Sequence, residues 1–537
     1  MRYHGLSIFF LAALITLSDG HLVWAQQPEL VSINQLGNNS GNYISGTVTT
    51  GRSPGISDDG RWVTFESRAT DLVALPDPNG DTVDIFVRDM LNNQTTVVSA
   101  NSAGAATCNS GAHDPVISGD GCWVAFVSAA TDLVAEDTSG GHSNVFLRDV
   151  VAGTTYLASA AYRGGFGGND DSASPIVSRD GRWVIFKSEA DDLVDLPDAN
   201  TRDDLFAWDR ITNTVHLITT NSAGTAAASG YPGTFAPTLA DPLGQFVTVV
   251  FASTFTDIVA NDNNGVSDVF RRTLPGGSNQ IINGILANGD STYPLISSDG
   301  GWVAFTSHAD NLVGIDLNLT YDCFVDDGAG IILVSSNAAG TDSGNDHSAC
   351  AGVNGNRGFV VFKSPATNLV ATDSNLDDDI FIRQVRTGQT SLVSANASGT
   401  DSANNYSLIR DLSIISSNGR FVVFESFATD IESINSDTAI DVYVRDHCLG
   451  TTTLMDPNLT GAGSGNNESD HARLSRDGRW VVFSSRATNL DSTDNNGWID
   501  TFRSEVPNWG DWGCGDLSLF SDGFEDGTMG AWSTVAP

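Results

Sequence analysis

Residues 57–67 read SDDGRWVTFES, and this stretch returns in similar form along the whole chain of 537 residues. Later copies read SGDGCWVAFVS, SRDGRWVIFKS, SSDGGWVAFTS, SSNGRFVVFES and SRDGRWVVFSS, with two weaker copies, DPLGQFVTVVFAS and NGNRGFVVFKS, between them. The aromatic residues that mark the register are Trp62, Trp123, Trp183, Phe246, Trp302, Phe359, Phe421 and Trp480. Their successive spacings of 61, 60, 63, 56, 57, 62 and 59 residues define eight units with a period near 60. A repeat array therefore replaces the several separate domains that the length alone would suggest.

Each unit is predicted to contain four short strands. In the first unit, residues 54–57 (PGIS) lead into an Asp-Gly turn, which is a strong hairpin signal. Three further strands are expected at residues 62–67 (WVTFES), 84–89 (DIFVRD) and 95–101 (TTVVSAN). Four antiparallel strands repeated eight times predict an all-β chain, a single eight-bladed β-propeller of four-stranded antiparallel blades. A string of β-sandwiches is the alternative, but each sandwich would need about 100 residues.

The two ends of the array predict that the ring is closed by the N-terminal segment. The eighth unit stops after its third strand, at residues 498–504 (WIDTFRS). Residues 30–45 (LVSINQLGNNSGNYIS) match residues 392–407 (LVSANASGTDSANNYS), which hold the fourth strand of unit six and the connection after it. A strand near residue 30 that completes the last blade would remove an open sheet edge.

The pattern S-x-D-G-R-W-V-x-F-x-S followed by D-I-F-V-R-D resembles the TolB-type, WD40-like (PD40) propeller repeats of exported bacterial proteins. The resemblance covers about residues 28–504. It does not extend to the α/β domain that precedes the propeller in TolB itself, so a Tol–Pal role is not implied. The resemblance implies a propeller and usually a binding role, and it implies no single activity.

The first residues are predicted to be a signal peptide. Arg2 is followed by an apolar run at residues 6–17, and Val23-Trp24-Ala25 fits a cleavage site after residue 25. The run of about 12 residues is too short to span a bilayer. We therefore expect a signal peptide at 1–25, a β-propeller at 26–504 and a C-terminal tail at 505–537. The mature protein is expected to be secreted or periplasmic, without a membrane span.

The charge balance excludes two classes of partner. The chain has 26 Lys and Arg against 65 Asp and Glu, which gives a formal net charge of −39. Such a chain repels phosphate backbones and anionic lipid, so nucleic acid and membrane surfaces are not expected partners. We expect a monomer.

Six cysteines lie beyond the predicted cleavage site, which is compatible with three disulfides in an exported protein. Cys448 and Cys514 are predicted to pair, because both follow the third strands of adjacent units. Cys323 and Cys350 are predicted to meet between units five and six. Cys108 and Cys122 remain by elimination, although the first strand that lies between them argues against that pairing.

The loops between second and third strands carry a repeated Asp-x-Asn-x-x-x-Asp pattern. Its five strict copies are Asp198/Asn200/Asp204, Asp262/Asn264/Asp268, Asp316/Asn318/Asp322, Asp373/Asn375/Asp379 and Asp494/Asn496/Asp500. The other units vary it as Asp77/Asn79/Asp84, Asn435/Asp437/Asp441 and Asp137/Ser139/Asn144. Hard oxygen ligands at alternate positions suit Ca²⁺, so these residues are candidate calcium ligands. The alternative is structural: Asp and Asn cap turns, and the last Asp is expected to pair with an arginine four residues on, as at Arg88, Arg383 and Arg445.

The long loops and the connections between blades are predicted to crowd one face of the ring, which is the expected binding surface. The sequence contains no G-x-S-x-G elbow, no P-loop and no H-E-x-x-H motif. His113 and His471 could serve a site in the central channel, or be ordinary hydrogen-bonded residues. The favoured function is a binding or scaffolding module for protein or glycan ligands. A polysaccharide-active lyase or hydrolase and a mainly structural envelope component are the alternatives.

Overall fold

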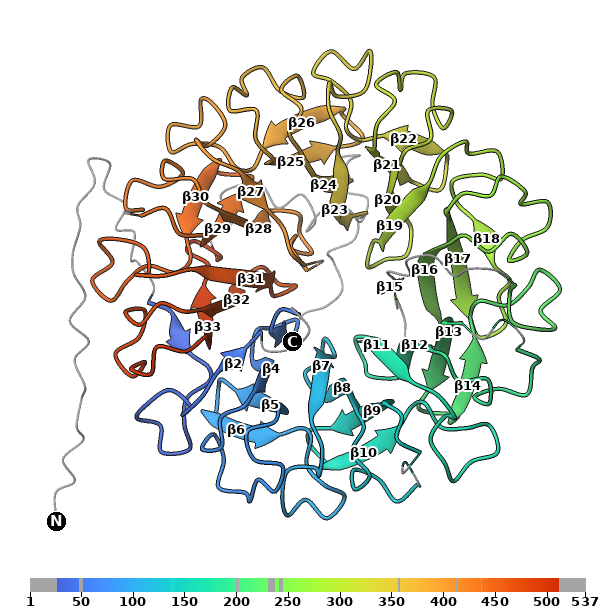
Figure 1. Ribbon diagram of the computed structural model, residues 1–537. Helices are drawn as coiled ribbons and strands as arrows, with labels where there is room; N and C mark the ends of the chain where they lie inside the picture. Colours follow the sequence, from blue (N-terminus) through green and yellow to red (C-terminus); the bar gives the residue numbers. More distant parts are fainter. Residues whose placement is uncertain are drawn as a thin grey trace, which may run out of the picture.

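Eight small antiparallel sheets stand in a ring around a common axis (Figure 1). The fold is that of a computed structural model, which describes residues 27–47, 52–136, 138, 140–198, 200, 202–229, 237–240, 245–355, 358–411, 413–435 and 437–510. The predicted signal peptide and residues 511–537 of the predicted tail lie outside the described residues. Every regular element within the described residues is a strand. The predicted eight-bladed, all-β propeller is confirmed.

The blades follow one another along the chain, and each runs from its innermost to its outermost strand. Blade one has β2 (Ser45–Gly46) and β3 (Gly55–Ile56), which both pair with β4 (Trp62–Ser67), then β5 (Asp84–Asp89) and β6 (Gln94–Val97). Blade two has β7 (Ala112–Ile117), β8 (Trp123–Ser128), β9 (Asn144–Asp149) and β10 (Thr154–Leu157). Blade three has β11 (Ser172–Val177), β12 (Trp183–Ser188), β13 (Asp204–Asp209) and β14 (Thr214–Leu217). Blade four has β15 (Thr238–Ala240), β16 (Val247–Ser253), β17 (Asp268–Leu274) and β18 (Gln280–Ile281).

The second half of the ring repeats this order. Blade five has β19 (Ser291–Ile296), β20 (Val303–Ser307), β21 (Asp322–Asp326) and β22 (Ile331–Leu333). Blade six has β23 (Ala349–Asn354), β24 (Phe359–Ser364), β25 (Asp379–Gln384) and β26 (Gln389–Leu392). Blade seven has β27 (Ser407–Leu408), β28 (Phe421–Ser426), β29 (Asp441–Asp446) and β30 (Thr451–Leu454). Blade eight has β31 (Ser469–Leu474), β32 (Trp480–Ser485), β33 (Asp500–Glu505) and, from the other end of the chain, β1 (Glu29–Leu30).

The predicted closure by the N-terminal segment is confirmed. Strand β1 pairs with β33, with Glu29 opposite Arg503 and Leu30 opposite Phe502. The Val31 N–H donates to the Thr501 carbonyl at 2.8 Å. The chain then returns inward, and β2 pairs with β4 to begin blade one. One segment thus joins the last blade to the first.

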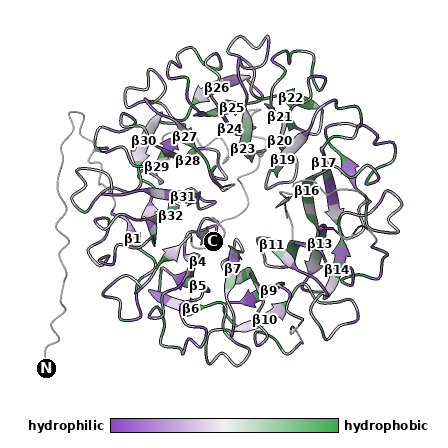
Figure 2. Ribbon diagram, viewed as in Figure 1, coloured by the Kyte–Doolittle hydropathy of each residue, from purple (hydrophilic) through white to green (hydrophobic). Residues whose placement is uncertain are grey.

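The blades pack through buried side chains, and because successive residues of a strand point to opposite faces, both faces of each sheet contribute. Figure 2 shows apolar residues among the strands around the ring. In every blade an aromatic residue of the second strand stacks on one of the third, with ring centroids 5.4 to 5.9 Å apart. Phe65 on Phe86 is the pair in blade one, and Phe483 on Phe502 is the pair in blade eight. These pairs give the ring a core that continues from blade to blade.

The Ser-x-Asp-Gly part of the repeat is a tight turn between the first and second strands. In blade one the Ser57 hydroxyl donates to Asp59 at 2.7 Å and accepts the Trp62 N–H at 3.0 Å. Asp59 accepts the Arg61 N–H at 3.0 Å. The Ser hydroxyl makes the same bonds at Ser118, Ser178, Ser297, Ser416 and Ser475. The most regular part of the sequence therefore builds the scaffold.

One of the predicted disulfides is confirmed, and the doubted pairing that remained by elimination does not form. Cys323 of β21 and Cys350 of β23 are bonded, which links blade five to blade six. Cys108 and Cys122 are free thiols, because β7 separates them: Cys108 lies in the connection before that strand and Cys122 in the turn after it. Cys448 is disulfide-bonded. Cys514 lies outside the described residues, so its pairing with Cys448 stays a prediction.

Candidate functional site

The asparagine of each Asp-x-Asn-x-x-x-Asp loop ties that loop to the connection that leads into the next blade. Its amide nitrogen donates to a backbone carbonyl there: Asn200 to Ala228 (2.8 Å), Asn264 to Ala287 (3.3 Å), Asn318 to Gly344 (2.8 Å), Asn375 to Ala403 (2.7 Å) and Asn496 to Gly41 (2.7 Å). Its amide oxygen accepts the backbone N–H two residues further on. Both ends of the amide are therefore engaged in holding the loop.

The last aspartate of the pattern is the first residue of each third strand and is fully buried. One of its oxygens accepts a hydrogen bond from a side chain that follows the fourth strand. The pairs are Thr219 to Asp204, Asn283 to Asp268 (2.6 Å), Ser335 to Asp322 (2.6 Å), Ser394 to Asp379 (2.5 Å) and Ser32 to Asp500 (2.6 Å). Burial raises the pKa of these carboxyl groups, to about 7 for Asp204 and Asp322 and to about 8 for Asp379.

The first aspartate of the pattern lies close enough to the last to raise the pKa of its carboxyl group. Repulsion from Asp316 adds to burial in raising the pKa of Asp322, and Asp373 does the same to Asp379. The corresponding pairs are Asp198 with Asp204, Asp262 with Asp268 and Asp494 with Asp500. The structure thus brings together the two carboxylates that the sequence singled out, with the asparagine as a structural neighbour.

The expected ion pair between the last aspartate and the arginine four residues on is wrong. The guanidinium of Arg88 donates to the Thr95 hydroxyl on the neighbouring strand at 2.9 Å, and Arg383 and Arg445 donate to Thr390 (2.7 Å) and Thr452 (3.0 Å). Residues four apart on a strand share a face, but they lie about 13 Å apart along it. The arginine therefore reaches across to the fourth strand and not back along its own.

The variant loops follow the same plan with local changes. In unit one, Asn79 donates to the Cys108 carbonyl at 2.9 Å, and burial raises the pKa of Asp84 to about 7. In unit seven, Asn435 donates to the Tyr443 hydroxyl at 2.9 Å. Asp437 of that unit accepts a hydrogen bond from Ser464, and the buried Asp441 faces a second buried carboxylate, Asp456. Asp137 and Ser139 of unit two lie outside the described residues.

The two histidines predicted near the axis lie on innermost strands, His113 on β7 and His471 on β31. His471 lies 2.8 Å from the Asp470 carboxylate. Beside them, Glu66 accepts the Asp114 N–H at 2.9 Å and Glu425 accepts the Ala472 N–H at 3.0 Å. These glutamates occupy equivalent positions and each ties its blade to the next. The charged groups around the axis thus act as clamps between blades.

Glu425 makes the stability of the ring dependent on pH. Burial raises the pKa of Glu425 from its ordinary 4.5 to about 7, although Arg410 donates to it at 2.8 Å. Between these values the folded protein keeps a proton that the unfolded chain has lost, so the free energy of unfolding falls as pH rises, by up to about 3 kcal/mol. Urea unfolding at about pH 5 and about pH 8 should show wild type losing stability relative to Glu425→Gln. A difference that stays constant with pH would contradict this.

A cavity of about 850 Å³ lies on the loop face between blades two and three. Its walls include Tyr162, Arg163 and Phe166 from the connection between these blades, and His142 from the β8–β9 loop. Asp191, Asp195, Leu196 and Pro197 from the β12–β13 loop complete it. Tyr162 and Phe166 are 60% and 58% exposed, so two aromatic rings stand at a concave polar surface.

The backbone around Tyr162 is the same as in the other connections between blades. The Tyr162 N–H donates to the Asp192 carbonyl at 2.7 Å. The equivalent bonds run from Ser102 to Asp132, Ser222 to Asp257, Ala338 to Asn368, Ala397 to Asp430 and Leu459 to Asn489. Four of these connections place a serine or alanine where the connection between blades two and three has tyrosine; the others have Leu459 and, with the same bond to Asp71 in the segment that joins blade eight to blade one, Gln35. The frame forms without the aromatic residues, so the fold does not account for them.

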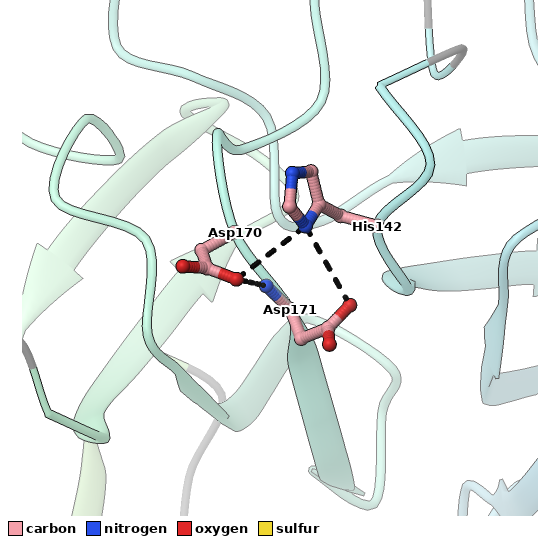
Figure 3. A group of neighbouring side chains, drawn as sticks. All are labelled: His142, Asp170 and Asp171. Carbon is pink, nitrogen blue, oxygen red and sulfur yellow. Dashed lines mark hydrogen bonds and ion pairs between the residues drawn. The ribbon is translucent and has the colours of Figure 1, made fainter.

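His142 also has no counterpart in the other loops, where its position holds residues such as Thr82, Arg202 or Val266. Its Nδ1 lies 3.4 Å from Asp170 and 3.9 Å from Asp171, and all three ligand atoms lie within 4.8 Å of one another (Figure 3). Such a group could hold a metal ion, and it equally forms an ion pair when the imidazole is protonated. It adds polar and charged groups to one side of the cavity.

This cavity was not predicted from the sequence. The signal was present in residues 161–168 (AYRGGFGG), which depart from connections such as 221–228 (NSAGTAAA) and 396–403 (NASGTDSA). An alignment of the repeats for their differences, and not only for their common residues, would have singled out Tyr162, Arg163 and Phe166.

No protein-family model and no curated protein matches the chain. Among solved structures, it is similar to the β-propeller domain of the trilobed protease from Pyrococcus furiosus, with 11% identity and a TM-score of 0.40 over 77% of this chain and 98% of that one. TolB from Acinetobacter baumannii matches with 15% identity and a TM-score of 0.31 over 64% of this chain and 65% of that one.

An oligogalacturonate lyase in complex with manganese matches with 14% identity and a TM-score of 0.38, over 73% of this chain and 88% of that one. At such low identities the similarities concern the propeller fold alone. Across the described residues, no helix is long and apolar enough to cross a bilayer.

Proposed function

We propose that this chain is an exported binding module that takes a glycan in the cavity between blades two and three. One observation carries the proposal: Tyr162 and Phe166 are exposed at a concave site whose backbone frame is built elsewhere in the ring without aromatic residues at these positions. Exposed apolar surface at a concave, polar-rimmed site is typical of a ligand site. The predicted signal peptide at 1–25 supports a secreted or periplasmic location.

The side chains around the cavity favour a sugar as the ligand. An aromatic ring can stack on the apolar face of a sugar, while carboxylates and amides accept and donate hydrogen bonds to its hydroxyl groups. Tyr162 and Phe166 supply the rings, and Asp191, Asp195 and Asn169 supply the polar groups. Arg163 adds N–H donors that can bond sugar hydroxyl groups.

The double variant Tyr162→Ser/Phe166→Ala should lose at least tenfold in affinity for the glycan that a glycan array identifies, and should keep the wild-type melting temperature. Both replacements are residues that the connection at 221–228 carries at the same positions, so the frame should be unaffected. A tenfold loss corresponds to about 1.4 kcal/mol, a modest value for two aromatic contacts at a binding site. Calorimetric titration of the wild type and the variant measures this.

The matched control is Leu459→Ser, at the equivalent position of the connection between blades seven and eight. It should leave glycan affinity unchanged. Equal weakening by both variants would contradict a site between blades two and three. If the array shows no glycan and a pull-down recovers a protein whose binding needs Tyr162 and Phe166, the ligand is a protein. Release of shortened sugars from the bound polysaccharide would instead favour the alternative, a polysaccharide-active lyase or hydrolase.

A further inference from the structure

The paired carboxylates of the repeated loops leave several buried oxygen atoms without a donor. Within the described residues, these oxygens accept no hydrogen bond: Asp262 Oδ1, Asp316 Oδ1, Asp322 Oδ2, both oxygens of Asp373, Asp379 Oδ2, Asp494 Oδ2 and Asp500 Oδ2. Asp322, Asp379 and Asp500 are wholly buried as residues. A buried carboxylate oxygen without a partner is strongly unfavourable. Its recurrence in blade after blade calls for a ligand.

Blade two shows what the fold alone requires at this position. Asn144 stands there in place of the last aspartate. Its amide oxygen accepts the Ser159 hydroxyl at 3.0 Å, and its amide nitrogen donates to the His142 carbonyl at 3.3 Å. A neutral amide therefore satisfies the strand and the hydroxyl that follows the fourth strand. The carboxylate in the other blades is not needed for that contact.

The charges that act most strongly on these aspartates are negative. For Asp379 they come from Asp373 and Asp377, for Asp322 from Asp316 and Asp342, and for Asp500 from Asp494 and Asp71. Two carboxylates in one buried loop need a counter-charge or a shared proton. A bound divalent cation supplies the counter-charge and a coordination partner for the oxygens that accept no hydrogen bond.

We propose that the carboxylate pairs of blades four to six and blade eight, where such oxygens occur, each bind one Ca²⁺, which stabilises the ring. Two carboxylates balance the charge of one Ca²⁺, and Ca²⁺ accepts six to eight oxygen ligands in flexible geometry. Mg²⁺ needs a small octahedral site and retains its waters, which suits a buried loop less well. The ligands are the two aspartates. The asparagine holds the loop in place, because its amide is hydrogen-bonded at both ends.

The paired aspartates lie in separate blades around the ring, so this cation binding does not depend on the ligand cavity between blades two and three. Its failure would leave the proposed glycan site untouched, and the reverse also holds. The variants in blades one and seven, with Asp84 and Asp441, keep the buried carboxylate but change its neighbours.

The protein should be stripped with a chelator and melted with and without about 10 mM CaCl₂. With dissociation constants of about 10⁻⁴ to 10⁻³ M, several sites should raise the melting temperature by about 5 to 8 °C. NaCl at matched ionic strength controls for charge screening, and MgCl₂ tests the choice of ion. Equilibrium dialysis should show about four Ca²⁺ per chain. An equal shift with NaCl, or no bound Ca²⁺, would overturn the proposal and leave a shared proton as the partner.

A single variant tests the assignment of ligands. Asp379→Asn places in blade six the residue that blade two already has, so it should fold. It should bind about one Ca²⁺ fewer per chain and melt no lower than wild type without Ca²⁺, because it removes an uncompensated buried charge. Asp401→Asn, a change at a carboxylate outside the buried pairs, is the control and should keep the full stoichiometry. Unchanged stoichiometry in Asp379→Asn would show that this pair binds no cation.

Discussion

Deletion of residues 26–45 is expected to leave blade eight with an exposed edge at β33 and to cause the protein to aggregate. The deletion removes β1 together with Leu30 and Val31, which are 5% and 0% exposed. Loss of these two buried side chains costs about 3 to 6 kcal/mol. It also leaves Asp500 without the Ser32 hydroxyl that bonds it at 2.6 Å. The melting temperature should fall by several degrees, since about 1 kcal/mol corresponds to about 1 °C in a chain of this length.

Aggregation should follow because an unpaired, flat strand edge offers its N–H and C=O groups to another copy. Size-exclusion chromatography and thermal melting of the truncated protein measure both effects. A permuted chain that carries residues 26–45 after β33, on a flexible linker, should recover the monomer and most of the stability. A truncated protein that stays monomeric with the wild-type melting temperature would show that this segment does not hold the ring together.

The architecture could be predicted because the same local rules act eight times. Three sequence features each predict one element of structure. The Ser-x-Asp-Gly sequence predicts a hairpin turn, the alternation of residues 62–67 predicts a strand, and the match between 30–45 and 392–407 predicts the missing fourth strand. The number of repeats then predicted the number of blades. The absence of a fourth strand from the eighth unit predicted that the N-terminal segment closes the ring. Even the Cys323–Cys350 disulfide followed, since it joins neighbouring blades whose order the repeat had defined.

The predicted ion pair between the last aspartate and the arginine four residues on was wrong because two residues on the same strand face were assumed to be in contact. Arg88 shares a face with Asp84, but the nearer partner is Thr95, which the fourth strand brings alongside. The cavity was missed for a related reason. His142 and Asp170 are 28 residues apart, and only the packing of blade two against blade three makes them neighbours.

The second large effect is expected at the contact between the turn of one blade and the tryptophan of the blade before it. Gly121 has a left-handed backbone with φ of 72°, and a Cβ there would lie 2.1 Å from Cδ1 and 2.6 Å from Cγ of Trp62. Gly60 makes the same contact with Trp480 across the junction of blades one and eight, and Gly181 makes it with Trp123. This glycine lets each turn lie flat on the indole of its neighbour.

Gly121→Ala should therefore destabilise the protein by about 2 to 5 kcal/mol, of which about 1 to 2 is backbone strain and about 1 to 3 the displacement of the indole. The matched control is Gly104→Ala. Its φ of 64° is also left-handed, but a Cβ there would meet nothing within 4 Å, so only the strain of about 1 to 2 kcal/mol should appear. Urea unfolding of both variants separates the two contributions. Equal losses would mean that the indole of Trp62 gives way freely, and that the blades are not locked through this contact.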